Sequence, residues 1–274
     1  MTDYEPISIG AALKAHSLQH YLKWIIDDQR DLEIQDFVSL EILDGDWKSR
    51  ALEIKSMLDG YHGRLGIHGP FWGFKIDSPD PLIRSVVNKR LHQGLDVCEA
   101  LGANQMVVHS PFSTWDYNNF DNNPNSRAHL HDRVKLTMAD VITRAEEMKC
   151  ELVLENIEDK DPLSRVELAR FLNSPSVRVS IDTGHAHYAH VSTGAPPVDY
   201  YVHAAGNLLS HVHLQDADGY ADRHWKPGDG TIRWASVFKA IQQTQSRPRL
   251  VLELRNPNDV AAGFQHLLSL GLVK

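Results

Sequence analysis

The sequence predicts a single-domain (β/α)8 TIM barrel over residues 1–274, and three observations lead to that prediction. Eight short apolar runs recur along the chain, with helical patterns between them. The length of 274 residues is ordinary for such a barrel. No glycine-rich phosphate-binding fingerprint follows the first apolar run, which disfavours the alternative, a doubly wound open sheet.

Each predicted strand is an apolar run that ends in polar residues. The strands are expected at residues 6–13, 31–40, 64–71, 104–112, 151–159, 177–185, 208–216 and 248–255. Alternation of strands with helices is typical of a parallel sheet that closes into a barrel.

The predicted helices lie between these strands. Residues 16–27 carry apolar side chains at helical spacing, and residues 78–102 begin with Asp-Pro and end with Gly. The other helices are expected at 126–149, 160–173, 199–208, 234–244 and 257–271. Residues 112–126 are predicted to be an irregular loop that overhangs the site, because they follow a strand end.

Composition limits the function classes. The formal net charge of −8 argues against broad electrostatic capture of nucleic acid. No apolar stretch is long enough to span a membrane, and the N-terminus lacks the features of a signal peptide. Cys98 and Cys150 form neither a disulfide framework nor a CxxC pair. We therefore expect a reduced, cytoplasmic protein without a membrane partner.

Polar side chains end most of the predicted strands. Because side chains alternate along a strand, Glu155 faces the barrel axis if Leu152 and Leu154 face the helices. The same reasoning turns several other strand-end side chains inward. They are His68, His109, Asp182, His213 and Glu253. Active sites of these barrels lie at the carboxyl ends of the strands, so we expect all six side chains at one mouth.

Residues 211–224 add a dense group of imidazoles and carboxylates, the usual ligands of zinc and manganese. His211 shares the inward face of His213 and is predicted to lie below or behind the ligands. Glu33 either points inward from the second strand or lies in an exposed turn. The alternative to a metal site is a network of salt bridges and hydrogen bonds, which would leave buried carboxylates without a cation.

Several motifs carry a family resemblance. IHGPF, VVHSPF, LVLENIED, IDTGHAH, HVHLQDADGYADRHWKPGDGTI and LVLELR resemble the xylose isomerase-like TIM barrel superfamily over roughly residues 6–255. That superfamily includes sugar and sugar phosphate isomerases and epimerases, and also endonuclease IV.

The resemblance implies two alternative ligand sets. The epimerase pattern implies one divalent metal, zinc or manganese, on Glu155, Asp182, His213 and Glu253, with Glu155 and Glu253 also moving the substrate proton. The endonuclease IV pattern implies three zinc ions, with Glu155 shared by two. It adds one set of His68, His109 and Glu155, and another of His185, Asp222 and His224. The sequence therefore predicts one to three ions.

Four further residues are candidates for substrate binding. Phe71 and Trp72 follow His68 and could form an apolar wall or pack a loop. Arg255 shares the face of Glu253 and could bind an anionic group. Lys226 could meet a phosphate or remain solvated.

We expect an isomerase or epimerase acting on a small sugar, sugar phosphate or polyol-derived ketone. The alternative is a multi-zinc phosphoester hydrolase resembling endonuclease IV, although a nucleic acid substrate is disfavoured by the charge. A non-enzymatic metal-binding scaffold is a third possibility. A homo-oligomer is compatible with this fold.

Overall fold

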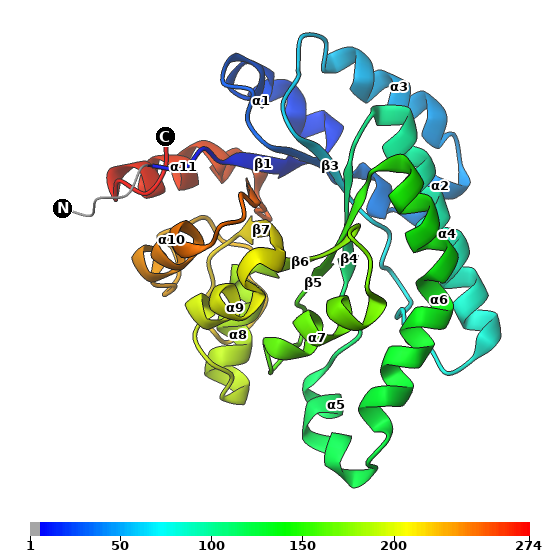
Figure 1. Cartoon of the computed structure of the whole chain (residues 1–274). Helices are drawn as coiled ribbons and strands as arrows, with labels where there is room; N and C mark the ends of the chain where they lie inside the picture. Colours follow the sequence, from blue (N-terminus) through cyan, green and yellow to red (C-terminus); the bar gives the residue numbers. More distant parts are fainter. Residues whose placement is uncertain (1–5) are drawn as a thin grey trace.

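A computed structural model, which describes residues 6–274, forms a closed barrel of eight parallel strands in chain order (Figure 1). The strands are β1 (Gly10–Leu13), β2 (Leu32–Ile34), β3 (Leu65–His68), β4 (Gln105–His109), β5 (Glu151–Glu155), β6 (Val177–Asp182), β7 (Leu209–Leu214) and β8 (Arg249–Leu252). The predicted fold class is confirmed, and each predicted strand contains an observed one.

Helices lie around the outside of the sheet (Figure 1). They are α1 (Ala15–Asp27), α2 (Leu40–Asp44), α3 (Trp47–Met57), α4 (Pro81–Leu101), α5 (Thr114–Asn119), α6 (Ser126–Met148), α7 (Leu163–Leu172), α8 (Thr183–Thr193), α9 (Val198–Ala205), α10 (Trp234–Gln243) and α11 (Val260–Ser269). The start and end signals predicted for α4 are present: Asp80 caps its first turn, and Gly102 ends it with φ of 75°.

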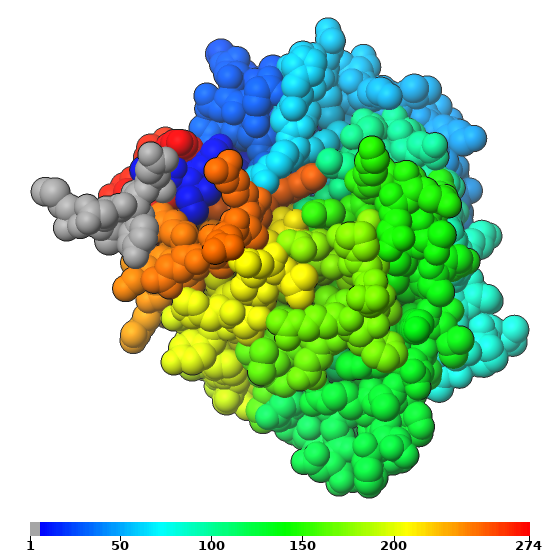
Figure 2. Space-filling view, in the orientation of Figure 1, coloured from blue at the N-terminus to red at the C-terminus, as the bar shows by residue number. Residues whose placement is uncertain are grey.

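The sequence reading missed α2, α3, α5 and α8. The prediction of an irregular loop at 112–126 is wrong, because Ser113 Oγ accepts from Asp116 N at 3.1 Å and starts α5. Within the described residues, none of 112–126 lines the central cavity described below, and the overhang stays a prediction. The segment that holds α5 projects at the bottom of Figures 1 and 2.

The hydrophobic core lies between the barrel and its helices. As predicted, Leu152 and Leu154 are buried there, on the face of the sheet opposite the acidic side chains, and Ile181 and Val212 follow the same alternation. This alternation directs the polar residues of the same strands to the barrel axis.

The barrel closes where β1 pairs with β8. Gly10 pairs with Val251 of β8 and on its other side approaches the residue before β2, since a Cβ at this position would lie 1.6 Å from the backbone oxygen of Asp31. The Asp31 carboxylate pairs with Arg64 at 2.6 Å and accepts from the backbone N–H of Leu250 at 3.1 Å. One buried acid thus ties β2 to β8 across β1.

The structure also bears on two composition-based expectations. Cys98 and Cys150 are buried free thiols. Within residues 6–274 no helix combines the length and the apolar composition needed to cross a membrane.

Candidate metal centre

A central cavity of about 730 Å³ opens at the carboxyl ends of the strands. Many of the predicted site residues line it, namely His68, Phe71, Trp72, His109, Glu155, His185, Asp222, His224, Glu253 and Arg255. Its size is that of a site for a small molecule.

Four side chains form what we call the central cluster: Glu155 and Glu253, which line this cavity, and Asp182 and His213, which are buried beside them. One donor atom from each lies within 4.8 Å of the others. His213 Nδ1 lies 2.6 Å from Glu155 Oε1 and 3.4 Å from Glu253 Oε2. The predicted inward orientation of these residues therefore brings them together from β5, β6, β7 and the end of β8.

His68, His109 and Glu155 form a second group, the histidine-pair cluster. Glu155 Oε2 lies 3.6 Å from Nε2 of both His68 and His109. Glu155 therefore directs one carboxylate oxygen to each of the two clusters, which is the arrangement needed for a shared ligand.

His185, Asp222 and His224 form a third group, the loop cluster. Asp222 Oδ1 lies 3.4 Å from His185 Nε2 and 3.0 Å from His224 Nε2. His224 adopts a φ of 49°, a left-handed backbone that is uncommon for a histidine. All nine donors expected from the resemblance thus lie in three adjoining groups.

The chemistry of these groups fits a cation. Glu155 Oε2 and Asp182 Oδ2 are buried and have no hydrogen-bond partner in residues 6–274. A buried oxygen left in that condition costs about 1–3 kcal/mol. Within the same range, every ion pair of the cluster carboxylates is with a histidine, and no lysine or arginine neutralises them. A salt-bridge network with lysine or arginine is therefore not what holds these acids.

The pKa values follow from burial and charge. Burial lowers the pKa of His109 to about 3, so this imidazole is neutral at pH 7 and its lone pair can bind a metal. Burial would also lower the pKa of His224, but Glu253, Asp222 and Asp182 overcome it and raise that pKa to about 9. Burial raises the pKa of the Asp182 carboxyl to about 6. The carboxylates thus favour the positively charged form of His224, and the same negative charge would favour a bound cation.

Asp182 also begins α8. Its Oδ1 accepts from the backbone N–H of His185 at 2.7 Å and from Gln215 Nε2 at 3.0 Å. Both bonds use the same oxygen, which leaves Oδ2 facing the central cluster. The N-cap therefore fixes the orientation of this carboxylate.

Gln215 is a residue that the sequence reasoning missed. Its amide donates to Asp182 Oδ1 and to Asp222 Oδ1 at 3.2 Å, and its oxygen accepts from His224 N at 3.0 Å. It lies against Gly184, where a Cβ would come within 2.1 Å of the Gln215 side chain. The signal was available, because Gln215 continues the inward face of His211 and His213.

Two other amides were missed. Gln35 Nε2 donates to Glu253 Oε1. Asn156 Nδ2 donates to the backbone oxygen of Asp182 at 3.0 Å, and Asn156 Oδ1 accepts from Asp182 N at 2.9 Å. Gln35 follows Glu33 at strand spacing, so alternation could have found it, whereas the role of Asn156 depends on pairing between strands.

The candidate substrate-binding residues lie in different places. The Phe71 ring stacks on His109 with centroids 4.0 Å apart, and Trp72 is 60% exposed beside it. Arg255 lies at the rim and donates to the backbone oxygen of Asp222 at 3.2 Å. Lys226 does not line the cavity, since its ammonium group pairs with Asp229.

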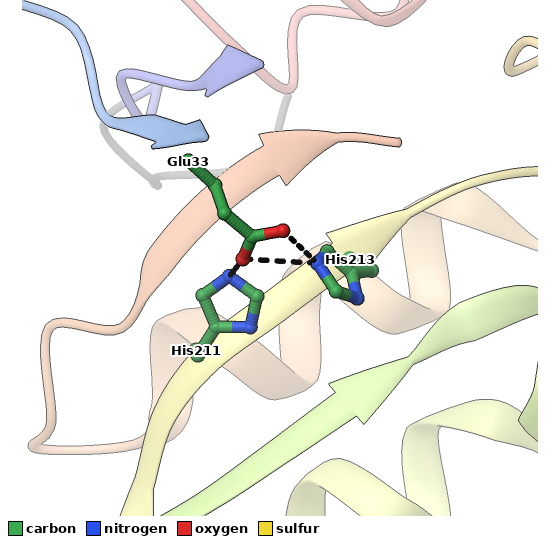
Figure 3. A group of neighbouring side chains, drawn as sticks. All are labelled: Glu33, His211 and His213. Atoms are coloured by element: carbon green, nitrogen blue, oxygen red, sulfur yellow. Dashed lines mark hydrogen bonds and ion pairs between the residues drawn. The ribbon is translucent and has the colours of Figure 1, made fainter. Parts of the chain in front are cut away.

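The alternatives that the sequence left open for Glu33 are resolved. Glu33 points inward and is buried, and its carboxylate lies between the rings of His211 and His213 (Figure 3). His211 lies below the central cluster, as predicted.

Comparison with known proteins agrees with this architecture. A model of the family described as xylose isomerase-like TIM barrel matches residues 34–270. The chain belongs to this family. A relative from Methanocaldococcus jannaschii, described as an uncharacterized protein, is 22% identical over 214 residues, which are 75% of this chain and 69% of the relative.

Solved structures of similar fold match nearly the whole chain. A Thermus thermophilus protein soaked with zinc chloride has a TM-score of 0.72 and 23% identity, over 96% of this chain and 98% of that one. A D-psicose 3-epimerase from Clostridium cellulolyticum, with D-tagatose, has a TM-score of 0.70 and 16% identity, over 97% and 100%. Other structural neighbours are also described as sugar epimerases. At these identities the similarity shows the fold.

Proposed function

We propose that this chain is a divalent-metal-dependent isomerase or epimerase of a small sugar, sugar phosphate or polyol-derived ketone. The observation that carries the proposal is the central cluster, two glutamates with an aspartate and a histidine, whose two glutamates line a cavity of about 730 Å³. A cavity of this size suits a small molecule and not a duplex. The sugar epimerases among the structural neighbours support the same class.

Glu155, Asp182, His213 and Glu253 would hold zinc or manganese. When bound, the metal would polarise the oxygens of the substrate and so acidify the carbon next to its carbonyl. Glu155 and Glu253 lie three strands apart around the closed barrel, at the ends of β5 and β8. One carboxylate takes the proton from carbon, and the other carboxyl group returns a proton to the opposite face, which inverts that centre.

Other residues of the chain would support these two. Gln35 donates to Glu253 Oε1 and fixes the orientation of that carboxylate. Phe71 and Trp72 offer an apolar wall for a sugar ring, and Arg255 is a cation for an anionic group at the rim. Lys226 would reach a substrate phosphate only after leaving Asp229.

The test is proton exchange in D₂O with zinc or manganese added. We expect deuterium to enter ketoses such as D-fructose or D-tagatose at the carbon next to the carbonyl. NMR measures this incorporation. Glu253→Gln should slow this exchange about 100- to 10,000-fold, the usual contribution of a positioned acid–base group. Glu41→Gln, at an exposed position of α2, serves as the matched control.

Absence of exchange and of new epimer across a panel of ketoses and ketose phosphates, with metal bound, would exclude the proposal. Equal loss in the Glu41→Gln control would point to a general defect of the preparation.

A second candidate is multi-metal phosphoester hydrolysis, and one observation favours it. Glu155 directs its two oxygens to two clusters, and the loop cluster adds a third set of donors. This candidate expects two or three ions per chain and hydrolysis of bis(4-nitrophenyl) phosphate, whereas the epimerase needs only one ion. Elemental analysis after loading with zinc separates the two.

A further inference from the structure

Below the central cluster lies a buried carboxylate to which the proposed function gives no role. Glu33, on β2, is 2% exposed and reaches across the barrel interior to His211 and His213 on β7 (Figure 3). Neither Glu33 nor these two histidines lines the central cavity. A carboxylate in such a place costs free energy unless charged or polar partners satisfy it.

The two nitrogens of His213 face different partners. Nδ1 points to the central cluster, 2.6 Å from Glu155 Oε1. Nε2 lies 3.0 Å from Glu33 Oε1 and 3.2 Å from Glu33 Oε2. The ring is fully buried, with His211 perpendicular to it at 4.5 Å and His68 stacked at 5.8 Å, so it has no room to exchange its nitrogens.

We propose that Glu33 is a positioning residue that fixes the tautomer of His213. Glu33 accepts a hydrogen bond from Nε2–H of His213 and so keeps the ring proton on Nε2. The Nδ1 lone pair is then free to ligate a cation in the central cluster. A carboxylate behind a metal-binding histidine orients the ring and increases its basicity. The inference rests on the proposed metal-dependent function and assigns a role to a residue outside the ligand set.

Glu33 is itself held in place. Ser180 Oγ lies 2.8 Å from His211 Nδ1 and can donate its hydroxyl proton there. That bond leaves the proton of His211 on Nε2, which lies 3.1 Å from Glu33 Oε2. His213 Nε2 lies within hydrogen-bond distance of both oxygens of Glu33, and His211 Nε2 adds a close ion-pair contact without hydrogen-bond geometry, so β2 contacts β7 through the barrel interior.

Glu33, His211 and His213 could instead bind a further ion, since their donor atoms lie within 4.8 Å of one another. Zinc takes four ligands, however, and residues 6–274 place no fourth His, Cys, Asp or Glu in this group. None of these three residues lines the central cavity, so water from the cavity does not reach them to complete the coordination of an ion. We therefore favour the positioning role, and the count of bound ions tests the other.

The experiment measures zinc affinity and stoichiometry in Glu33→Gln and in the matched control Glu151→Gln. Glu151 is also an inward-facing carboxylate with hydrogen bonds, to Gln105 and Ser210, but it lies at the opposite end of the barrel. We expect Glu33→Gln to bind zinc about 10- to 100-fold more weakly at unchanged stoichiometry. Glu151→Gln should stay within about twofold of wild type.

A second readout follows the tautomer directly. In zinc-loaded protein with ¹⁵N-labelled histidine, long-range ¹H–¹⁵N spectra should show His213 protonated at Nε2 and bound through Nδ1. Glu33→Gln should lose that single state while circular dichroism shows a folded chain. Ligation through Nε2 in the wild type, or unchanged affinity in folded Glu33→Gln, would overturn the proposal, as would the loss of one ion from the stoichiometry.

These outcomes are separable from failure of the proposed function. If zinc binds through His213 Nδ1 but no sugar exchanges its proton, the epimerase proposal fails and the role of Glu33 remains. If sugars exchange normally and Glu33→Gln binds zinc like wild type, only the role of Glu33 fails.

Discussion

Single amide side chains join the acidic groups of this site. Gln215 bonds to Asp182 of the central cluster and to Asp222 of the loop cluster, so the two groups keep a fixed spacing. Its oxygen also holds the backbone of His224 in a left-handed conformation. A neutral residue therefore sets the geometry of charged ones, and the arrangement of donors does not depend on the acids alone.

His224 distinguishes the two candidate functions at this scale. If the loop cluster holds an ion needed for activity, His224→Ala should lower the bound zinc by one ion per chain and the activity by at least about 100-fold. If His224 only orders its segment, the zinc content should stay the same and activity should fall only severalfold. His203→Ala, at an exposed position of α9, is the control for a generic histidine loss.

The element that carries Asp222 and His224 is the long connection between β7 and α10. It has little regular structure, and the buried carboxylate of Asp216 organises it. Asp216 accepts from the backbone of Gly228 at 2.9 Å and of Ile232 at 3.2 Å, and from Trp234 Nε1 at 3.1 Å. The Asp216 side chain thus holds the start of this connection against its end.

Asp216→Ala should therefore lower the free energy of unfolding by about 3 kcal/mol, because several donors would lose their acceptor. Urea denaturation measures this loss. Asp218→Ala, in the same connection but paired with Arg223 near the surface, should remain close to wild type. Equal stability of both variants would mean that the connection is held by other contacts.

Prediction from sequence succeeded where one element determines the outcome. Alternation along β5 and β7 placed Glu155 and His213 on the axis without knowledge of their neighbours. It failed where one residue has two roles: Asp182 ends β6 and also caps α8, so the strand was extended to 185 and the helix was missed. The contact of Glu33 with His213 spans 180 residues, and no local pattern reports it.

At the scale of the whole molecule, the barrel depends on closure between β1 and β8 beside the Asp31–Arg64 pair. The candidate metal-binding side chains at the carboxyl ends of the strands stay together only if all eight strands keep their register. Gly10 lies at this junction, where the backbone of Asp31 leaves no space for a side chain.

Gly10→Ala should reduce the free energy of unfolding by about 3 kcal/mol, since a rigid backbone must move to admit the methyl group. The control is Gly66→Ala on β3, where the nearest atom to a new Cβ is 3.2 Å away and the loss should be smaller. Thermal or urea unfolding compares the two. A smaller effect at position 10 than at position 66 would contradict this account of closure.

The double use of Asp182 limits which amino acids can occupy that position. Asparagine would begin α8 equally well but would bring no negative charge to the central cluster. Glutamate would keep the charge, but its longer chain would displace the oxygen from the amide of His185. Aspartate meets both demands and each of these two substitutions meets only one, so position 182 couples the charge of the central cluster to the start of α8.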